Sequence, residues 1–359
     1  MAERKKPGKY LHVREGIEQP PSVNPVVFSG KKKKKYTGDE YFAGILNGNR
    51  TILSQAITLA ESSLTEHSDM IQAVIERCLP YSGKSIRIGI TGVPGVGKST
   101  FIETFGLYIC ESGRRTAVLA VDPSSDSTKG SILGDKTRME KLSIHPHAFI
   151  RPSPAAGTLG GVARKTRETI ILCEAAGFDT VLVETVGVGQ SETAVHSMVD
   201  FFLLLMLAGA GDELQGIKRG IMEMADAIAI TKADGVNKIH AANAAILYRN
   251  ALALFPEQPS GWKPQVLTCS AVDKSGIKEL WELINDYVSF TRTNGYFGER
   301  RRQQSVIRMN DTITEYLNNS FYGSKEVIIM KPLLEKQLYD GRITSYKAAL
   351  ALIDKYMKR

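Results

Sequence analysis

Residues 92–99 of this chain read GVPGVGKS, and an apolar run, SIRIGI at residues 85–90, precedes them. The motif matches G-x-x-x-x-G-K-[S/T], which binds phosphate when a strand enters it and a helix leaves it. Its glycines let backbone N–H groups surround a β-phosphate, its lysine neutralises β- and γ-oxygens, and its serine offers a hydroxyl to Mg²⁺. The nucleotide-binding residues predicted here are Gly92, Val93, Pro94, Gly95, Val96, Gly97, Lys98, Ser99 and Thr100.

Seven apolar runs alternate with helical patterns along residues 81–292. The runs are rich in Val, Ile and Leu without in–out alternation, which is typical of parallel strands buried on both faces. Their alternation with helices predicts an α/β fold, a doubly wound and mostly parallel sheet that carries the phosphate loop. The predicted strands are residues 85–90, 116–122, 147–152, 178–185, 200–207, 226–232 and 264–270.

The segments on either side of this domain have different patterns. Residues 1–40 combine several prolines with five consecutive lysines, which predicts a basic, unstructured tail. Residues 41–80 and 293–359 carry apolar side chains at helical spacing. We therefore expect N-terminal helices at 41–80 and a C-terminal helical segment at 293–359, with Thr344 capping the last helix.

The net charge of +8 does not by itself indicate a nucleic-acid partner. Residues 1–35 hold ten Lys and Arg against three acids, whereas residues 36–359 hold 36 against 35, so the excess lies in the tail. Such a lysine run is typically solvated, and contact with a phosphate or an acidic partner is the alternative. The four cysteines form no C-x-x-C pair, and the longest apolar stretch is too short to cross a bilayer. We expect a reduced, cytoplasmic protein without a nucleic-acid or membrane partner.

Two short motifs at successive strand ends indicate which base is bound. In TKAD (231–234), Asp234 can accept hydrogen bonds from N1–H and N2–H₂ of guanine, and adenine offers neither donor there. The stem of Lys232 can lie along the base, while the backbone of CSA (269–271) meets O6. Buried polar groups of this kind reject a ligand that lacks the matching atoms. The motifs predict a GTP or GDP site that includes Thr231, Lys232, Asp234, Ser270, Ala271 and Val272.

The metal and γ-phosphate residues depart from the pattern of small GTPases. The segment ETVG (184–187) stands where Asp-x-x-Gly is expected, so Glu184 can reach Mg²⁺ through a water and the Gly187 N–H can meet the γ-phosphate. Asp122 and Asp135 follow the second strand, and acids at strand ends also act as helix caps or turn formers. Gln190 comes three residues after Gly187, whereas Ras-like enzymes have their glutamine directly after the glycine.

Several segments occur in the order and spacing of one family. GVPGVGKST, VDPSS, GSILGDKTRM, RPSPAAGTLGG, ETVGVGQSE, GAGDELQGIKRG and TKAD resemble the MeaB/ArgK family, which includes the methylmalonic aciduria type A proteins, over about residues 45–355. The resemblance implies that Lys98, Ser99, Asp122, Asp135 and Glu184 hold phosphate and Mg²⁺, and that residues 122–138, 184–193 and 207–218 are switches. It further implies a homodimer formed by the C-terminal helices. Thr231 stands where many members have Asn.

The family is that of G-protein chaperones of methylmalonyl-CoA mutase. The resemblance therefore implies a GTPase whose hydrolysis gates the loading of adenosylcobalamin and protects or reactivates a B12-dependent acyl-CoA mutase. The predicted catalytic residues are Lys98, Glu184, Gln190 and Lys218, the last in a polar, glycine-rich segment (209–220) expected to relay the nucleotide state to the mutase. The alternatives are a nickel-insertion metallochaperone GTPase, for which His145 and His147 form the one close histidine pair, a transport kinase, and a nucleotide sensor without fast hydrolysis.

Overall fold

The computed structural model describes residues 36–62, 65–121, 139–152, 159–185, 191–209 and 219–358. Residues 38–359 form one compact unit. Of the predicted site residues, Asp122, Asp135, Gly187, Gln190 and Lys218 lie outside the described residues.

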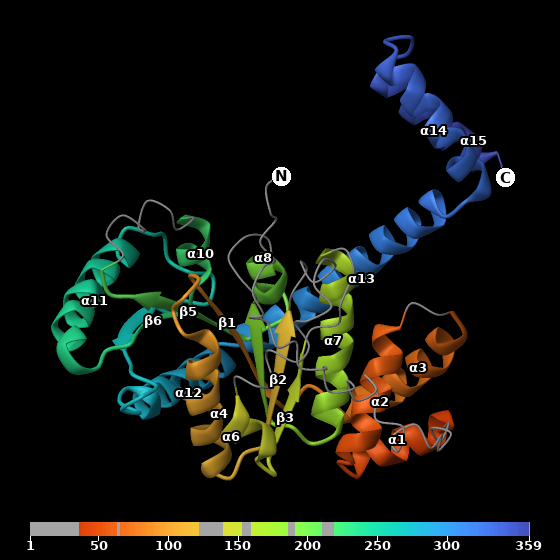
Figure 1. Cartoon of the computed structure of the whole chain (residues 1–359). Coiled ribbons are helices and arrows are strands. Elements are labelled where there is room, and N and C mark those ends of the chain that lie inside the picture. The colour runs from red at the N-terminus through yellow and green to blue at the C-terminus, as the bar shows by residue number, and fades with distance from the viewer. Residues whose placement is uncertain are drawn as a thin grey trace, which may run out of the picture. The chain divides into compact units, whose positions relative to one another are not determined.

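Seven strands form a single sheet in which every pair of neighbours is parallel (Figure 1). The sheet order is β3-β2-β4-β1-β5-β6-β7. From β1 the chain runs out to β2 and β3, returns as β4 between β1 and β2, and then extends the other side of the sheet from β5 to β7. The strands are β1 (Ile86–Gly92), β2 (Thr116–Val121), β3 (Ala148–Arg151), β4 (Thr180–Thr185), β5 (Phe201–Leu207), β6 (Ala227–Thr231) and β7 (Gln265–Thr268). The predicted doubly wound, parallel fold is confirmed.

The central strands are buried along nearly their whole length because most of their side chains are apolar on both faces. All residues of β2, β4 and β6 are buried. β1 and β5 each have one half-buried residue. The continuous Val, Ile and Leu runs thus have the packing that a sheet covered by helices on both faces requires.

Helices cover both faces of the sheet, as right-handed crossovers dictate. On one face, α4 (Lys98–Glu111) packs against α6 (Glu140–Ile144) and α12 (Ile277–Thr293). On the other face, α7 (Leu159–Ala175) packs against β2 and against α8 (Ser191–His196), which follows β4. The return helices of the β5–β6–β7 half are α10 (Arg219–Met224) and α11 (Lys238–Leu252), with the 3₁₀ turn η2 (Gly235–Asn237) between β6 and α11.

In the described part of the chain, three helices and a 3₁₀ turn precede β1, and all three helices contact α7. They are α1 (Gly38–Leu46), α2 (Arg50–Glu61), α3 (Thr65–Cys78) and η1 (Leu79–Tyr81). The Asn49 side chain caps α2 by accepting hydrogen bonds from the N–H groups of Thr51 and Ile52. The buried face of α2 consists of Leu53, Ala56, Ile57 and Ala60, at the spacing that indicates a helix in the sequence.

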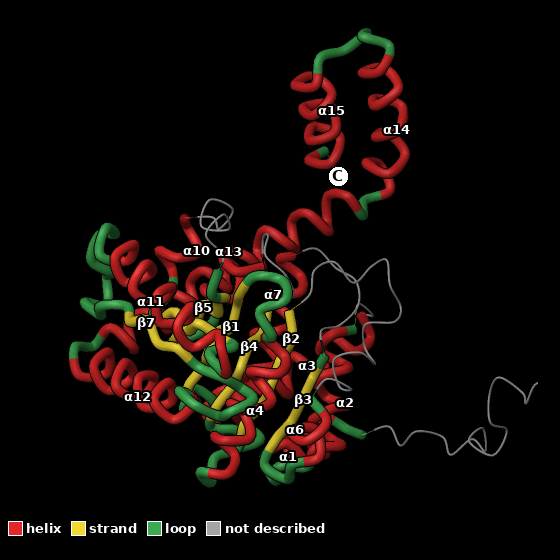
Figure 2. The backbone as a smooth tube through the Cα atoms, turned by 60° about the vertical axis from the view of Figure 1, so that its left-hand side comes forward, coloured by secondary structure: helices red, strands yellow, loops and turns green. Residues whose placement is uncertain are grey.

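The chain ends in α13 (Tyr296–Tyr322), α14 (Lys325–Tyr339) and α15 (Ser345–Met357). α14 and α15 lie side by side in Figure 2 and pack on each other. Ser324 and Thr344 cap these two helices by accepting hydrogen bonds from the N–H groups of Val327 and Lys347. Within the described parts of the chain, every helix is too short or too polar to cross a membrane.

Candidate nucleotide-binding site

The carboxyl ends of the strands meet at one edge of the sheet, and the sequence motifs fall there. In the strand register Gly92 lies opposite Leu205, Leu207 opposite Thr231, and Ile230 opposite Thr268. The phosphate loop, TKAD and CSA therefore follow β1, β6 and β7 at the same edge, with β5 between β1 and β6, and α4 starts at this edge too (Figure 1). In open α/β sheets this edge is where ligands bind.

The phosphate loop has the backbone geometry of an anion cradle. Gly95 and Gly97 have φ values of +78° and +87°, a region that side chains other than glycine rarely adopt. A Cβ atom on Gly92 would lie 2.5 Å from the carbonyl oxygen of Leu205, so no other residue fits there. Val93 and Val96 are buried and anchor the loop, and Gly97 leads directly into the first turn of α4. Backbone N–H groups at such a helix start favour phosphate.

Lys98 is half-buried at the base of this loop, and its Nζ donates a hydrogen bond to the carbonyl oxygen of Gly92 at 2.8 Å. Burial lowers the pKa of Lys98, and the carboxylates of Glu184 and Glu192 oppose that change. The two acids thus partly offset the effect of burial on a lysine whose positive charge would face phosphate oxygens.

Glu192 is a site residue that sequence reasoning missed. It is 2% exposed, lies in the first turn of α8, and interacts electrostatically with Lys98. The signal available in the sequence is its place at the end of ETVGVGQSE, where an acid opens a helix directly after a glycine-rich segment.

Thr231 ties the phosphate loop to the sheet. Its buried Oγ1 lies 2.8 Å from the carbonyl oxygen of Val96 and 3.2 Å from that of Met206. The hydroxyl thus satisfies a carbonyl of the phosphate loop from the end of β6. Position 231 therefore needs a side chain that can form hydrogen bonds because that side chain holds the phosphate loop in place.

Lys232 and Asn237 shape the turn after β6. Lys232 has a φ of +55°, and its Nζ donates to the carbonyl oxygen of Gly95 at 2.9 Å. The side chain therefore runs from the TKAD turn to the phosphate loop, across the space between phosphate and base. The Nδ2 of Asn237 donates to the carbonyl oxygen of Lys232 at 2.7 Å and supports this unusual backbone conformation.

Asp234 and Ser270 meet at the base end of the site. Ser270 is fully buried, and its Oγ donates to Oδ2 of Asp234 at 2.7 Å. The same Oγ accepts hydrogen bonds from the N–H groups of Val272 and Asp273, so it holds the CSA turn as well. The carbonyl oxygen of Ala271 accepts from Thr104 of α4 at 3.2 Å. These bonds fix one oxygen of Asp234 and leave the other for a ligand, as far as the described residues show.

The predicted metal residues are only partly described. Glu184 is buried on β4, opposite Ile90 of β1 and Ala120 of β2, while Ser99 is half-buried at the start of α4. A serine hydroxyl and a carboxylate are the hard oxygen ligands that Mg²⁺ prefers. Within the described ranges no three His, Cys, Asp or Glu residues gather into a metal-binding group.

A parallel sheet with this loop, this lysine and this guanine-type carboxylate at its carboxyl edge defines a P-loop GTPase. Comparison with known proteins identifies the family, since residues 53–326 match the model of the methylmalonyl-CoA mutase-associated GTPase MeaB. The chain belongs to the MeaB family and is a GTPase.

Individual relatives agree with this assignment over most of their length. The chain is 47% identical to a probable GTPase of Mycobacterium tuberculosis over 318 residues, which cover 89% of this chain and 95% of that protein. It is 48% identical to the GTPase ArgK of Escherichia coli over 279 residues, or 78% and 84% of the two chains. It is 43% identical to the mitochondrial methylmalonic aciduria type A homolog of Mus musculus over 331 residues, or 89% and 80%. A crystal structure of a LAO/AO transport system kinase superposes with a TM-score of 0.71 at 36% identity, covering 90% of this chain and 98% of that one.

Proposed function

We propose that this GTPase is a chaperone that gates the loading of adenosylcobalamin into a B12-dependent acyl-CoA mutase and protects or reactivates that enzyme. The mutase named by the family, methylmalonyl-CoA mutase, is the partner proposed for this chain. The observation that carries the guanine-nucleotide part is the Asp234–Ser270 pair, which follows β6 and β7 at the same edge as the phosphate loop, with β5 between β6 and β1. We place the protein in the cytoplasm.

We propose that the nucleotide binds with Mg²⁺ held by Ser99, Asp122, Asp135 and Glu184. Bound there, the metal would neutralise charge on β- and γ-oxygens. The loop N–H groups orient the phosphates, Lys98 supplies positive charge, and Gly187 and Gln190 approach the γ-phosphate. The hydrogen bond from Lys98 to the Gly92 carbonyl supports this arrangement because it keeps the ammonium group at the phosphate loop, and the charges of Glu184 and Glu192 favour its charged form.

The partner would act through Lys218. We propose that Lys218 completes the site or reaches a second protomer only in the activated complex, which leaves basal hydrolysis slow. Substitution of Lys218 by alanine should leave basal turnover and GTP affinity within a few-fold of wild type and abolish stimulation by the mutase. Lys278→Ala is the matched control, since Lys278 is exposed on α12 and pairs only with Glu282 among the described residues. If the mutase stimulates the Lys218 variant as it does wild type, the proposed role of Lys218 in relaying the nucleotide state is refuted.

The partner itself is identified by a pull-down with purified B12-dependent mutases. The capture should depend on whether GDP or a non-hydrolysable GTP analogue is bound. If no B12-dependent mutase is retained in either state, while GTP binding is intact, the chaperone role fails and the GTPase assignment stands.

We further propose a homodimer formed by the C-terminal helices. Its support is a row of apolar residues on α13 that is largely exposed in one chain: Met309, Ile313, Tyr316 and Leu317. The first turns of α13 are held differently, because Arg301 pairs with the buried Asp200 and Gln304 donates to the carbonyl oxygen of Val199. The interface is therefore expected beyond residue 305.

The dimer is tested in the full chain with Ile313→Glu and Leu317→Glu together. Light scattering should show a monomer that still binds GTP. Ile239→Glu on α11 is a control, because Ile239 is also an exposed apolar residue on a helix. A dimer that persists in the double variant would exclude this interface.

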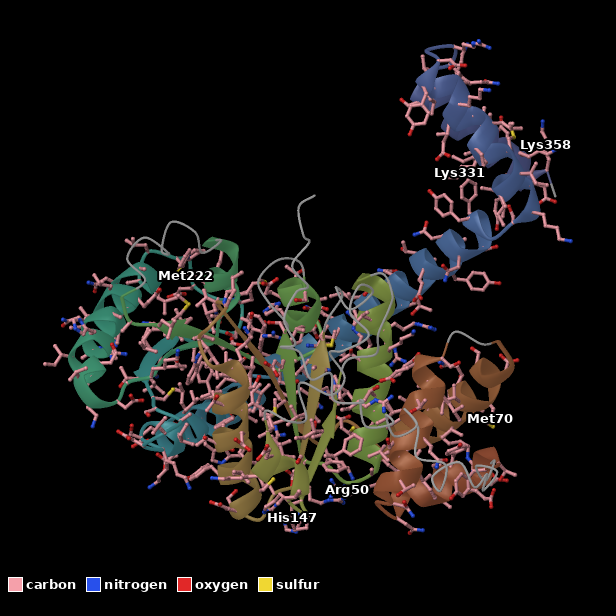
Figure 3. All side chains as sticks on the ribbon, in the orientation of Figure 1. Arg50, Met70, His147, Met222, Lys331 and Lys358 are labelled. Atoms are coloured by element: carbon pink, nitrogen blue, oxygen red, sulfur yellow. The ribbon has the colours of Figure 1, made fainter. Side chains whose placement is uncertain are left out.

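The nickel-insertion alternative gains no support from the histidine pair. His145 and His147 lie in the turn before β3, and β3 begins opposite the first residue of β2. They are therefore at the amino edge of the sheet, and Figure 3 shows His147 at the opposite end from Met222 of α10. Nickel ligands coupled to hydrolysis would be expected at the nucleotide edge.

A further inference from the structure

A cavity of about 240 Å³ lies between the turn after α3, α7, the end of α8 and α13. Its lining includes four arginines, Arg87, Arg167, Arg301 and Arg308, and no acidic residue. Gly83, Ser82, Ser197 and Ser305 contribute polar atoms beside them. A concave surface with several guanidinium groups and no carboxylate has the composition of an anion site.

This cavity is separate from the nucleotide site. Arg87 is the second residue of β1, whereas Gly92 ends that strand at the phosphate loop. Five residues at about 3.3 Å each place the two some 16 Å apart, at opposite edges of the sheet. A ligand here is therefore not the GTP phosphate.

Three of the arginines already have carboxylate partners. Arg87 donates two hydrogen bonds to Glu174, at 2.8 and 3.0 Å. Arg301 pairs with Asp200 at 2.7 Å, and Arg167 pairs with Asp311 at the same distance. None of these three acids lines the cavity, so their carboxylates do not neutralise the remaining arginine, Arg308, from within it.

Arg308 is the fourth. Its side chain is half-buried on α13 and makes no ion pair or hydrogen bond with any residue that the structure describes, whereas its carbonyl oxygen accepts from Thr312. Burial lowers the pKa of its guanidinium, Glu168 opposes this, and the charges of Arg167, Arg164 and Arg87 lower the pKa further. The Nε of Arg167 is also buried without a partner in the described structure, as are two acceptors, Oε1 of Gln304 and Oε2 of Glu168. Two guanidinium groups at this cavity therefore offer N–H donors that no described residue accepts, and Arg308, which is only half-buried, offers its donors to the open part of the cavity.

We propose that this cavity binds a phosphate group, with Arg308 as its principal ligand. Arginine recognises phosphate oxygens through paired N–H donors, and the Nη1 of Arg87, which has no described acceptor, adds another. The hydroxyl protons of Ser82 and Ser197 already go to backbone carbonyls, so the guanidinium groups supply the recognition. The volume equals about eight water molecules in the liquid, which leaves room for phosphate together with part of an attached alcohol.

A bound phosphate would add a link between the elements that line the cavity. Arg308 and Ser305 belong to α13. Ser82 lies in the turn before β1, and Ser197 directly follows α8. The anion would hold α13 against these segments by neutralising the charge that Arg308 brings to them. Occupancy should therefore raise the thermal stability of the folded chain.

The test uses the full chain saturated with GDP and Mg²⁺, so that the phosphate loop is filled. Inorganic phosphate and glycerol 3-phosphate are titrated separately against chloride at constant ionic strength, with the melting temperature and calorimetric heat as readouts. Wild type should show a saturable response with one site. Arg308→Gln should weaken binding at least tenfold, since it removes charged donors. A stronger response to glycerol 3-phosphate than to inorganic phosphate would identify a phosphomonoester as the ligand. Equal responses would identify free phosphate as the ligand.

Arg302→Gln is the matched control, because Arg302 is an exposed arginine of the same helix that pairs with Glu299. It should bind phosphate as wild type does, and Arg308→Lys should retain part of the affinity. GDP affinity, measured with a fluorescent analogue, verifies that each variant is folded. The proposal is overturned if wild type gives no saturable response, or if Arg308→Gln responds like wild type.

Discussion

Substitution of Asp234 by asparagine should change the base that this GTPase binds. Ser270 donates to Oδ2 of Asp234 at 2.7 Å, which leaves Oδ1 without a described donor and one lone pair free on Oδ2, so the carboxylate can still accept from both N1–H and N2–H₂ of guanine. In the variant, the Ser270 hydroxyl still needs an acceptor, and the amide oxygen of Asn is the one available. Ser270 therefore turns the amide nitrogen toward the base, where it donates to the C2 carbonyl of xanthine and repels the N2–H₂ of guanine.

The loss for guanine nucleotides follows from two hydrogen bonds to a charged acceptor. At about 1.5–3 kcal/mol each, they amount to roughly 3–6 kcal/mol, which corresponds to a loss of about 10² to 10⁴-fold in affinity. Fluorescent GDP and XDP analogues, titrated by anisotropy, measure both affinities. Asp273→Asn is the control, because Asp273 lies in the same turn but pairs with Lys238. GDP binding within tenfold of wild type, or equal binding of ATP and GTP by wild type, would refute the reasoning.

Three further predictions concern the phosphate loop, its tether and pH. Lys98→Ala should remove most nucleotide affinity, whereas Glu184→Ala should impair Mg²⁺-dependent hydrolysis more than GDP binding; wild-type turnover in the Glu184 variant would show that this carboxylate is only structural. Thr231→Val leaves the Val96 carbonyl without its donor and should cost about 1–2 kcal/mol in urea unfolding, whereas Thr231→Asn, which can donate, should cost less. Burial and the charge of Arg300 lower the pKa of His196 to about 4, from 6.5. The folded state therefore resists protonation of His196, and the free energy of unfolding falls as pH drops below 6.5, by about 2 kcal/mol between pH 7 and 5. In urea unfolding, His196→Gln should lose less stability over this pH range by that amount. An equal loss in both proteins would contradict the prediction.

The strands were predictable because burial on both faces leaves a continuous apolar signal. Each of the seven predicted runs contains a strand, and β1 continues two residues beyond its run to Gly92. The helix at 50–61 was equally visible, since its buried positions repeat at helical spacing. The strands and this helix are set by residues that are close together in the sequence, so the local pattern of apolar residues predicts them.

Contacts between distant residues could not be predicted in the same way. The sequence placed Thr231 with the base, but its hydroxyl lies against the Val96 carbonyl, 135 residues away in the chain. Glu192 was overlooked because its closeness to Lys98 depends on how β4 and β1 pair. The arginine cavity likewise collects residues from four separate segments. In each case the fold must be known before the chemistry can be seen.

The short helix α8 shows how the two edges of this sheet are joined. Its first turn carries Glu192 beside Lys98, and six helical residues span only about 9 Å. At its other end, the His196 carbonyl accepts a hydrogen bond from Arg300, and Arg167 donates to Ser197 at 2.7 Å. Arg300 belongs to α13 and Arg167 to α7, so one turn and a half of helix connects the lysine of the phosphate loop with both. Because packed helices shift as rigid bodies rather than bend, a displacement at Glu192 would be felt directly at α13, the helix on which the proposed dimer contact and Arg308 both lie.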